Sequence, residues 1–146
     1  MKTGGVLLSL LAVAVGAALS ASAASAPSRK VFRISMTSFK FDPSIIRFHE
    51  GDRVVLQLVN EDPQRPHNIA SAYFDQVELT VRGEFRRGTT SDGRPFVFVE
   101  PGNQAEVEFV ARGRGQYSFL CSVGQHAAQG MTGAFAILPP GASAGQ

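Results

Sequence analysis

Residues 115–138, GQYSFLCSVGQHAAQGMTGAFAIL, contain the most informative feature of the chain. Two strand-like segments flank a loop that holds the only cysteine, Cys121, with His126 and Met131 following in the same loop. A thiolate and a thioether are soft ligands, and beside an imidazole they suit copper better than a hard, oxygen-preferring ion. Zinc would accept the cysteine and the histidine, but its structural sites close with cysteine, histidine or carboxylate. The loop therefore predicts a copper site.

A further ligand is expected from the first half of the chain. His67 follows the strand-like run RVVLQLVN at residues 53–60 and a polar connection that contains proline. Taken alone, a histidine after a strand is usually an ordinary surface or core residue. Together with Cys121 and His126, however, it would complete a trigonal His2Cys set, with the weak axial sulfur supplied by Met131.

The order of these residues and the segments around them resemble the cupredoxins, the small blue-copper electron carriers. The resemblance covers roughly residues 30–138. FKFDPSIIRFHEGDRVVLQLVNED, residues 39–62, is similar to the family's first half, where strands lead through a Gly-Asp turn toward the first ligand histidine. The end of the chain is similar in its Gly-x-Tyr strand, its ligand loop and a last strand that opens with Met-Thr-Gly. The resemblance implies an all-β, Greek-key β-sandwich that holds one type 1 copper ion.

Carried over residue by residue, the resemblance also implies the ligands. The three strong equatorial ligands and the weak axial one match, in chain order, His67, Cys121, His126 and Met131. Asn68 matches a polar residue that hydrogen-bonds across to the ligand loop, and Ser122 is its expected partner. The ring edge of His126 is expected to reach the surface and to pass electrons. A small apolar surround for brief docking is expected from Pro66, Ala127, Ala128 and Gly130.

Two features depart from the family. Many relatives carry Pro-Gly directly before the loop histidine, whereas this chain has Gly124 and Gln125, and Gln125 lacks the conformational freedom of glycine. The segment 71–94 matches no well-known member. Within it, residues 71–82 are compatible with either a short helix or an irregular strand.

The strand signals agree with an all-β fold. Short runs rich in β-branched and aromatic residues recur between turn residues, at 31–34, 45–48, 54–59, 96–99, 105–110, 117–120 and 134–138. Short strands at such spacing predict a β-sandwich or barrel. Eleven phenylalanines and no tryptophan predict a core rich in aromatic rings. We assign Met36 to that core, expect Tyr117 to anchor a corner through its hydroxyl, and place His49 at an exposed turn outside the site.

The N-terminal residues 1–23 have the pattern of a secretory signal peptide, with Lys2, an apolar run and small residues at 21–23. The alternative is an uncleaved anchor, but a run this short is marginal for spanning a bilayer. We therefore expect a periplasmic or secreted protein with no membrane span in its mature chain. After the signal peptide, its expected parts are a flexible lead at 24–30, one domain at 31–138 and a disordered tail at 139–146.

The cysteine count and the charge narrow the function. A lone cysteine in an exported protein cannot form an internal disulfide, which favours a bound metal. The net charge of +2 does not indicate a nucleic-acid-binding protein. Four arginines cluster in sequence and form either a solvated loop or a docking patch for an acidic redox partner; they are Arg82, Arg86, Arg87 and Arg94.

The leading interpretation is a monomeric electron carrier without catalysis, passing single electrons between redox partners such as cytochromes or a terminal oxidase or reductase. The alternative is a periplasmic copper carrier or chaperone that serves an oxidase or copper homeostasis. A Cys-His enzyme would lack an orienting third residue and would leave Met131 unexplained. Multicopper oxidases and copper nitrite reductases need more than three histidines, and a dinuclear copper loop needs two cysteines.

Overall fold

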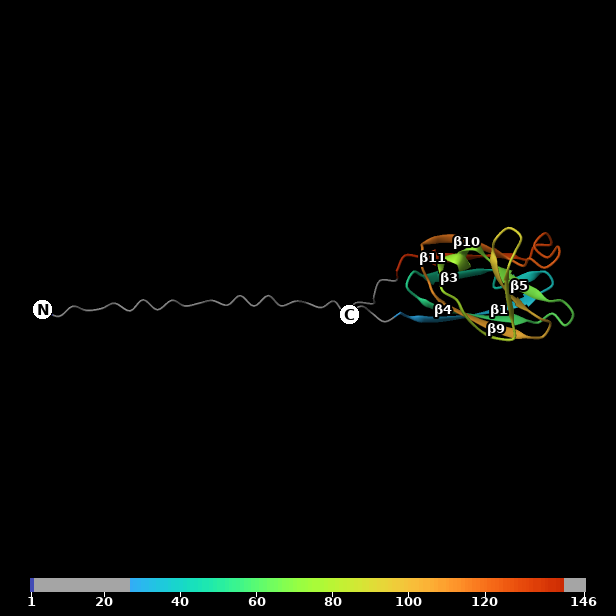
Figure 1. The fold of residues 1–146 in the computed structure, drawn as a ribbon, viewed down its shortest axis with the longest axis horizontal. Coiled ribbons are helices and arrows are strands. Elements are labelled where there is room, and N and C mark those ends of the chain that lie inside the picture. The colour runs from blue at the N-terminus through green and yellow to red at the C-terminus, as the bar shows by residue number, and fades with distance from the viewer. Residues whose placement is uncertain (2–26, 141–146) are drawn as a thin grey trace.

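The computed structural model describes Met1 and residues 27–140 of the chain, and these fold into two β-sheets packed face to face (Figure 1). The predicted signal peptide, apart from Met1, the first residues of the predicted lead and the tail beyond residue 140 lie outside the described residues. The β-sandwich expected from the sequence is therefore confirmed.

The first sheet has five strands. In spatial order they are β2 (Lys40–Asp42), β1 (Arg29–Thr37), β4 (Arg53–Asn60), β9 (Gln104–Val110) and β6 (Thr80–Gly83). The parallel pair in this sheet is β1 with β4, and its other neighbours are antiparallel. The chain crosses to the second sheet four times, after β2, β4, β6 and β9.

The second sheet has six strands. In spatial order they are β3 (Ile45–His49), β11 (Thr132–Leu138), β10 (Gly115–Leu120), β5 (His67–Ala70), β8 (Pro95–Val99) and β7 (Arg86–Thr89). Here β3 and β11 are parallel and the other neighbours antiparallel. Because β5 lies beside β10, the strand that begins at His67 is next to the strand that leads into Cys121.

Each of the seven predicted runs lies within a strand of the structure. The strands that the sequence did not indicate are β2, β5, β6 and β7, each of three or four residues. The ambiguous segment after residue 71 contains a short 3-10 helix, η1 (Ala72–Gln76), followed by β6. At the other end, β1 begins at Arg29, two residues before the expected start of the domain.

Side-chain alternation explains how the two sheets share a core. Along β9 the burial alternates, so that Ala105, Val107 and Phe109 face inward. Aromatic rings fill the space between the sheets, and the centroids of Phe119 and Phe135 lie 4.7 Å apart. Met36 is fully buried, as predicted. Burying rings of this size removes a large apolar area from water, which stabilises the sandwich.

The corner predicted for Tyr117 is made by Tyr73. The hydroxyl of Tyr73 donates to the carbonyl oxygen of Arg112 at 3.0 Å and accepts from the Arg112 N–H at 3.1 Å. Tyr117 instead packs its ring against Tyr73, with centroids 4.8 Å apart. Tyr73 lies on η1, in the segment that the sequence left ambiguous. The prediction relied on the strand that precedes Cys121, and that strand contains Tyr117 but not the tyrosine that forms the corner.

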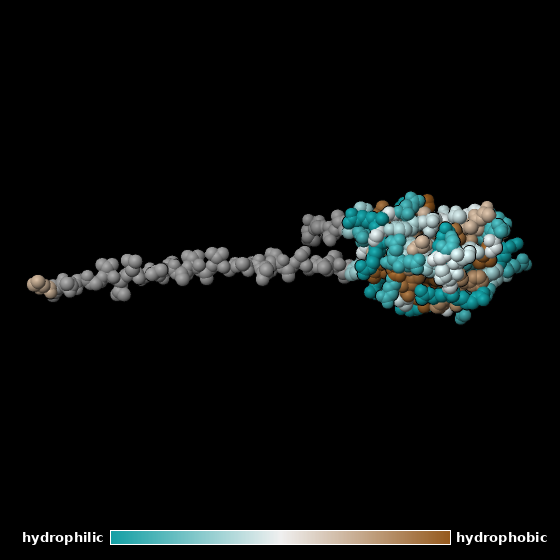
Figure 2. Space-filling model, turned by 45° about the horizontal axis from the view of Figure 1, so that its top comes forward, coloured by the Kyte–Doolittle hydropathy of each residue, from teal (hydrophilic) through white to brown (hydrophobic). Residues whose placement is uncertain are grey.

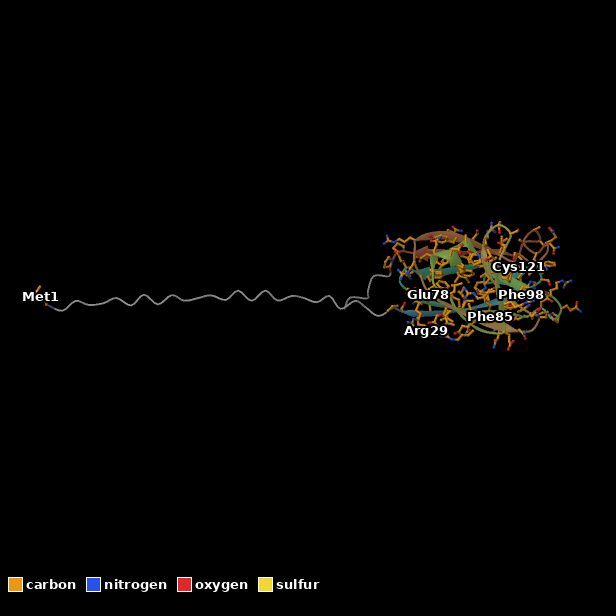
Figure 3. All side chains as sticks on the ribbon, viewed as in Figure 1. Met1, Arg29, Glu78, Phe85, Phe98 and Cys121 are labelled. Atoms are coloured by element: carbon orange, nitrogen blue, oxygen red, sulfur yellow. The ribbon has the colours of Figure 1, made fainter. Side chains whose placement is uncertain are left out.

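Hydrophilic residues cover most of the face shown in Figure 2, with smaller apolar areas between them. Figure 3 places Cys121 toward one end of the sandwich and Arg29 at the opposite end, where the chain enters the first sheet. The loop after Cys121 lies at that first end together with the β1–β2 and β4–β5 connections (Figure 1).

Gly133 is expected to be intolerant of any side chain. It lies opposite Phe119 in the β10–β11 pair, and a Cβ there would stand 2.3 Å from the Phe119 ring and 2.4 Å from the Ser44 carbonyl oxygen. We expect Gly133→Ala to lower the free energy of unfolding by about 1–3 kcal/mol, since a packed core cannot absorb an extra methyl group. Urea unfolding of the copper-free protein measures this.

Gly88→Ala, on the edge strand β7, is the matched control, because its Cβ would meet only the side chain of Phe96 on the neighbouring strand β8. That ring can rotate away, so the loss should be smaller than for Gly133→Ala. Equal losses in the two variants would contradict the packing explanation.

Candidate metal centre

Three of the four predicted ligands place donor atoms at one point. His67, at the start of β5, and Cys121, directly after β10, are fully buried, and His126 in the following loop is partly exposed. One ligand atom from each residue lies within 4.8 Å of the other two. In the part of the chain that the structure describes, this is the one such group of histidine, cysteine and carboxylate side chains.

The same nitrogen of each histidine faces the cysteine. The Nδ1 atoms of His67 and His126 are 3.2 Å apart. The sulfur of Cys121 is 3.4 Å from Nδ1 of His126 and 3.9 Å from Nδ1 of His67. Three donors that converge in this way can surround a single ion as a trigonal set, and they need little movement to do so.

Burial favours the uncharged form of each of these donors. Removal from water lowers the pKa of His67, with Asp62 acting in the opposite direction. Burial also lowers the pKa of His126, and the positive charge of Arg65 adds to that effect. Burial raises the pKa of the Cys121 thiol, which N–H groups of the backbone partly offset. A cation would therefore meet two neutral imidazoles and release a proton from the thiol.

Met131 closes the ligand loop. Its side chain is fully buried, its N–H donates to the carbonyl oxygen of His126 at 3.0 Å, and its own carbonyl accepts from Cys121 at 3.0 Å. These bonds hold the backbone of all three loop residues together. They place the predicted axial residue beside the other donors.

Asn68 ties the loop to β5, as the sequence predicted. Its side-chain amide donates to Ser122 Oγ at 2.8 Å, and its side-chain oxygen accepts from the Ser122 N–H at 2.8 Å. The backbone N–H of Asn68 points at the Cys121 sulfur, 3.4 Å away. A donor to the sulfur stabilises a thiolate there and adjusts the potential of a metal bound to it.

In the ligand loop, the left-handed backbone conformation occurs at Gly124 and not at Gln125. Gly124 has φ +49°, and in the described residues every positive φ belongs to a glycine. The left-handed position thus falls one residue earlier than the Pro-Gly of many relatives would place it. His126 remains partly exposed while His67 is fully buried, in agreement with the predicted route to the surface.

Two residues near the site were missed from the sequence. The ring of Phe39, in the β1–β2 turn, lies 4.8 Å from the ring of His126, and the carboxylate of Asp62 lies 3.5 Å from Nε2 of His67. Phe39 gave no signal, because 87 residues separate it from its neighbour in the sequence. Asp62 could have been noticed, since the Asn60-Glu61-Asp62-Pro63 run ends four residues before His67 and is typical of a turn held by side chains.

The remaining candidates lie away from the metal cluster. His49 is partly exposed at the end of β3, and its ring nitrogen is 3.7 Å from Asp52. Of the sequence-clustered arginines, Arg82 lies on β6 in the first sheet, and Arg86 and Arg87 lie on β7 in the second. Three of the four have acidic neighbours: Arg82 is 3.1 Å from Glu108, Arg86 is 2.6 Å from Glu100, and Arg94 is 3.1 Å from Asp92. These pairs reduce the positive charge that a docking patch would need.

Comparison with known proteins identifies the family. A family model described as a cupredoxin-like domain matches residues 9–132. The chain belongs to the cupredoxin-like family. No curated protein matches the chain.

Three solved structures illustrate the likeness. Reduced auracyanin from the photosynthetic bacterium Roseiflexus castenholzii is 20% identical, with a TM-score of 0.58, and the match covers 75% of this chain and 97% of that one. Auracyanin A, a "blue" copper protein from Chloroflexus aurantiacus, is 15% identical, with a TM-score of 0.57 and coverage of 75% and 99%. A multicopper oxidase from Campylobacter jejuni is 10% identical, with a TM-score of 0.53 over 80% of this chain and 31% of that one. At these identities the likeness shows the shared fold.

The family and the donor chemistry agree on the metal. The cupredoxin fold presents two imidazole nitrogens and a thiol sulfur at one point, and Met131 is buried in the same loop. Two imidazoles, a thiolate and a thioether are the donor set of a type 1 copper ion. Copper is therefore the cofactor that this site suits.

Among the described residues, no helix has the length and apolar character needed to cross a bilayer.

Asn68→Ala is expected to lower the free energy of unfolding, because it removes the side-chain bonds that attach the ligand loop to β5. It leaves the partly buried N–H of Ser122 without its acceptor, at a cost of about 1 kcal/mol in the free energy of unfolding of the copper-free protein. Urea unfolding measures the loss. Ser122→Ala, which removes one of the two side-chain bonds, should cost less. A larger loss of unfolding free energy in Ser122→Ala than in Asn68→Ala would contradict the assignment of Asn68 as the main connection between β5 and the ligand loop.

Proposed function

We propose that this protein carries single electrons on one type 1 copper ion. Nδ1 of His67, Nδ1 of His126 and the Cys121 sulfur are the equatorial ligands, and the Met131 sulfur is the weak axial one. The observation that carries the proposal is the convergence of the three donors within 4.8 Å on a closed β-sandwich. Auracyanin A, a "blue" copper protein of the same fold, supports it.

A rigid donor set favours electron transfer over other uses of copper. Cu(I) and Cu(II) prefer different geometries, and a scaffold that imposes one arrangement on both reduces the rearrangement that accompanies each transfer. Here β5 supplies one histidine, the end of β10 supplies the cysteine, and bonds from Asn68 join them. The partly exposed His126 is the exit for the electron.

The proposal extends to the setting of the protein. The pattern of residues 1–23 supports export to the periplasm or beyond, where the lone thiol is protected by its metal. Redox proteins such as cytochromes or a terminal oxidase or reductase are the partners, with brief docking around His126, and the protein acts as a monomer without catalysis of its own.

Copper titration of the purified protein tests the ligand set. We expect added Cu(II) to produce intense charge-transfer absorption toward the red end of the visible spectrum, because a thiolate bound to Cu(II) donates into the metal. Cys121→Ser should lose that band while its far-ultraviolet circular dichroism stays unchanged. His49→Ala, which removes the histidine outside the cluster, should retain the band in full.

Electrochemistry of the copper form separates electron transfer from copper delivery. An electron carrier should cycle reversibly between Cu(I) and Cu(II) without losing metal. A colourless protein that holds only Cu(I) and exchanges it readily would contradict the proposal and indicate a copper carrier instead.

A further inference from the structure

The second nitrogen of His67 has a distinctive environment. Nδ1 of this ring faces the metal cluster, so Nε2 points the other way, toward the β4–β5 connection. In the described residues, Nε2 of His67 is the one buried side-chain nitrogen or oxygen without a hydrogen-bond partner. The nearby acceptor is Oδ2 of Asp62, 3.5 Å away, slightly beyond a well-formed hydrogen bond.

The two carboxylate oxygens of Asp62 have different hydrogen-bond partners. Oδ1 accepts from the N–H groups of Gln64 at 3.0 Å and Arg65 at 2.9 Å, which shapes the connection before His67. Oδ2 accepts from the hydroxyl of Ser38, in the β1–β2 turn, and faces His67. The side chain is 4% exposed, so its charge is little screened by water. Loop shaping accounts for Oδ1, whereas Oδ2 has the Ser38 hydroxyl, Nη1 of Arg65 at 3.9 Å and Nε2 of His67 as its neighbours.

We propose that Asp62 is a positioning residue for His67, and that its Oδ2 accepts a hydrogen bond from the Nε2–H group of that ring. This contact holds the neutral ring in the tautomer that leaves Nδ1 bare and aimed at the metal. The buried negative charge also stabilises Cu(II) relative to Cu(I) and lowers the reduction potential of the copper, a part of the inference that rests on the proposed function.

The physical reason is that a neutral imidazole carries one proton. A ring nitrogen can bind a metal only when the proton is on the other nitrogen, and the acceptor beside that other nitrogen decides the tautomer. Carboxylate partners of ligand histidines orient the ring and increase its basicity. Asp62 is the carboxylate in this position, and its place is set by two backbone N–H groups rather than by a flexible contact.

Asp62→Asn tests the inference with almost no change in size. The two backbone N–H groups should retain the amide oxygen at the Oδ1 position, so that the NH2 group faces Nε2 of His67. A donor there favours the opposite tautomer, with the proton on Nδ1. In the copper-free protein, 15N chemical shifts of the histidine rings report which nitrogen is protonated. We expect Nε2–H for His67 in the wild type and Nδ1–H in Asp62→Asn.

The copper form provides the second readout. In Asp62→Asn we expect Cu(II) affinity to fall about 10- to 100-fold, as for other partners of ligand histidines, and the midpoint potential to rise. Glu61→Gln is the matched control, because it removes a neighbouring negative charge that contacts Arg33 and Ser35. Its effect on potential should be smaller, and it should leave the tautomer unchanged.

Ser38→Ala covers the case in which Asp62→Asn fails to fold. It removes the competing donor to Oδ2 and keeps the carboxylate, so His67 should retain Nε2–H. A wild-type ring protonated on Nδ1 would overturn the inference, and so would an Asp62→Asn potential no higher than that of Glu61→Gln. If the wild-type copper form shows the charge-transfer band, either of these two results would contradict the inference about Asp62 but not the proposed function. Absence of that band from the wild type would remove the proposed function and the redox part of the inference, whereas an Nε2–H ring would still support the positioning role.

Discussion

The side chain and backbone of Asn68 form the connection on which the site depends. Two hydrogen bonds join its side chain to Ser122, 54 residues away in the sequence, and its N–H points at the sulfur of Cys121. Since Asn68 directly follows His67 and Ser122 directly follows Cys121, these contacts set how far one ligand lies from the other. The remaining features of the site extend from this connection.

The fold supplies rigidity on one side and access on the other. His67 begins β5 and Cys121 follows the last residue of β10, the neighbouring strand of the second sheet, against a core of packed aromatic rings. His126 lies in a loop, between the surface and the metal position, with the ring of Phe39 4.8 Å away. A packed interior has few alternative arrangements, so donors fixed to it hold their geometry when the charge of the metal changes.

Sequence reasoning succeeded where the signal was local and the run was long. The runs at 54–59 and 105–110 alternate or concentrate apolar residues over enough positions to indicate strands, and they became β4 and β9. It failed at β5 and β7, which have four residues each, because so short a segment shows no usable period. It also chose the wrong tyrosine for the corner, since the partner of Tyr73 is the backbone of Arg112, 39 residues away.

The sequence by itself determined the chemistry of this protein: one thiol, a loop histidine, a thioether and an earlier histidine, in an order that indicates a copper site in a β-sandwich. Only the tertiary structure decided which atoms meet. The pairing of β5 with β10 brings Nδ1 of His67 to the sulfur, and the backbone bonds of the ligand loop hold His126 beside it. The same arrangement turns Nε2 of His67 toward Asp62. The physical reason is that residue types are written in the chain, whereas ring orientation and the direction of a carboxylate follow from contacts between segments far apart in it.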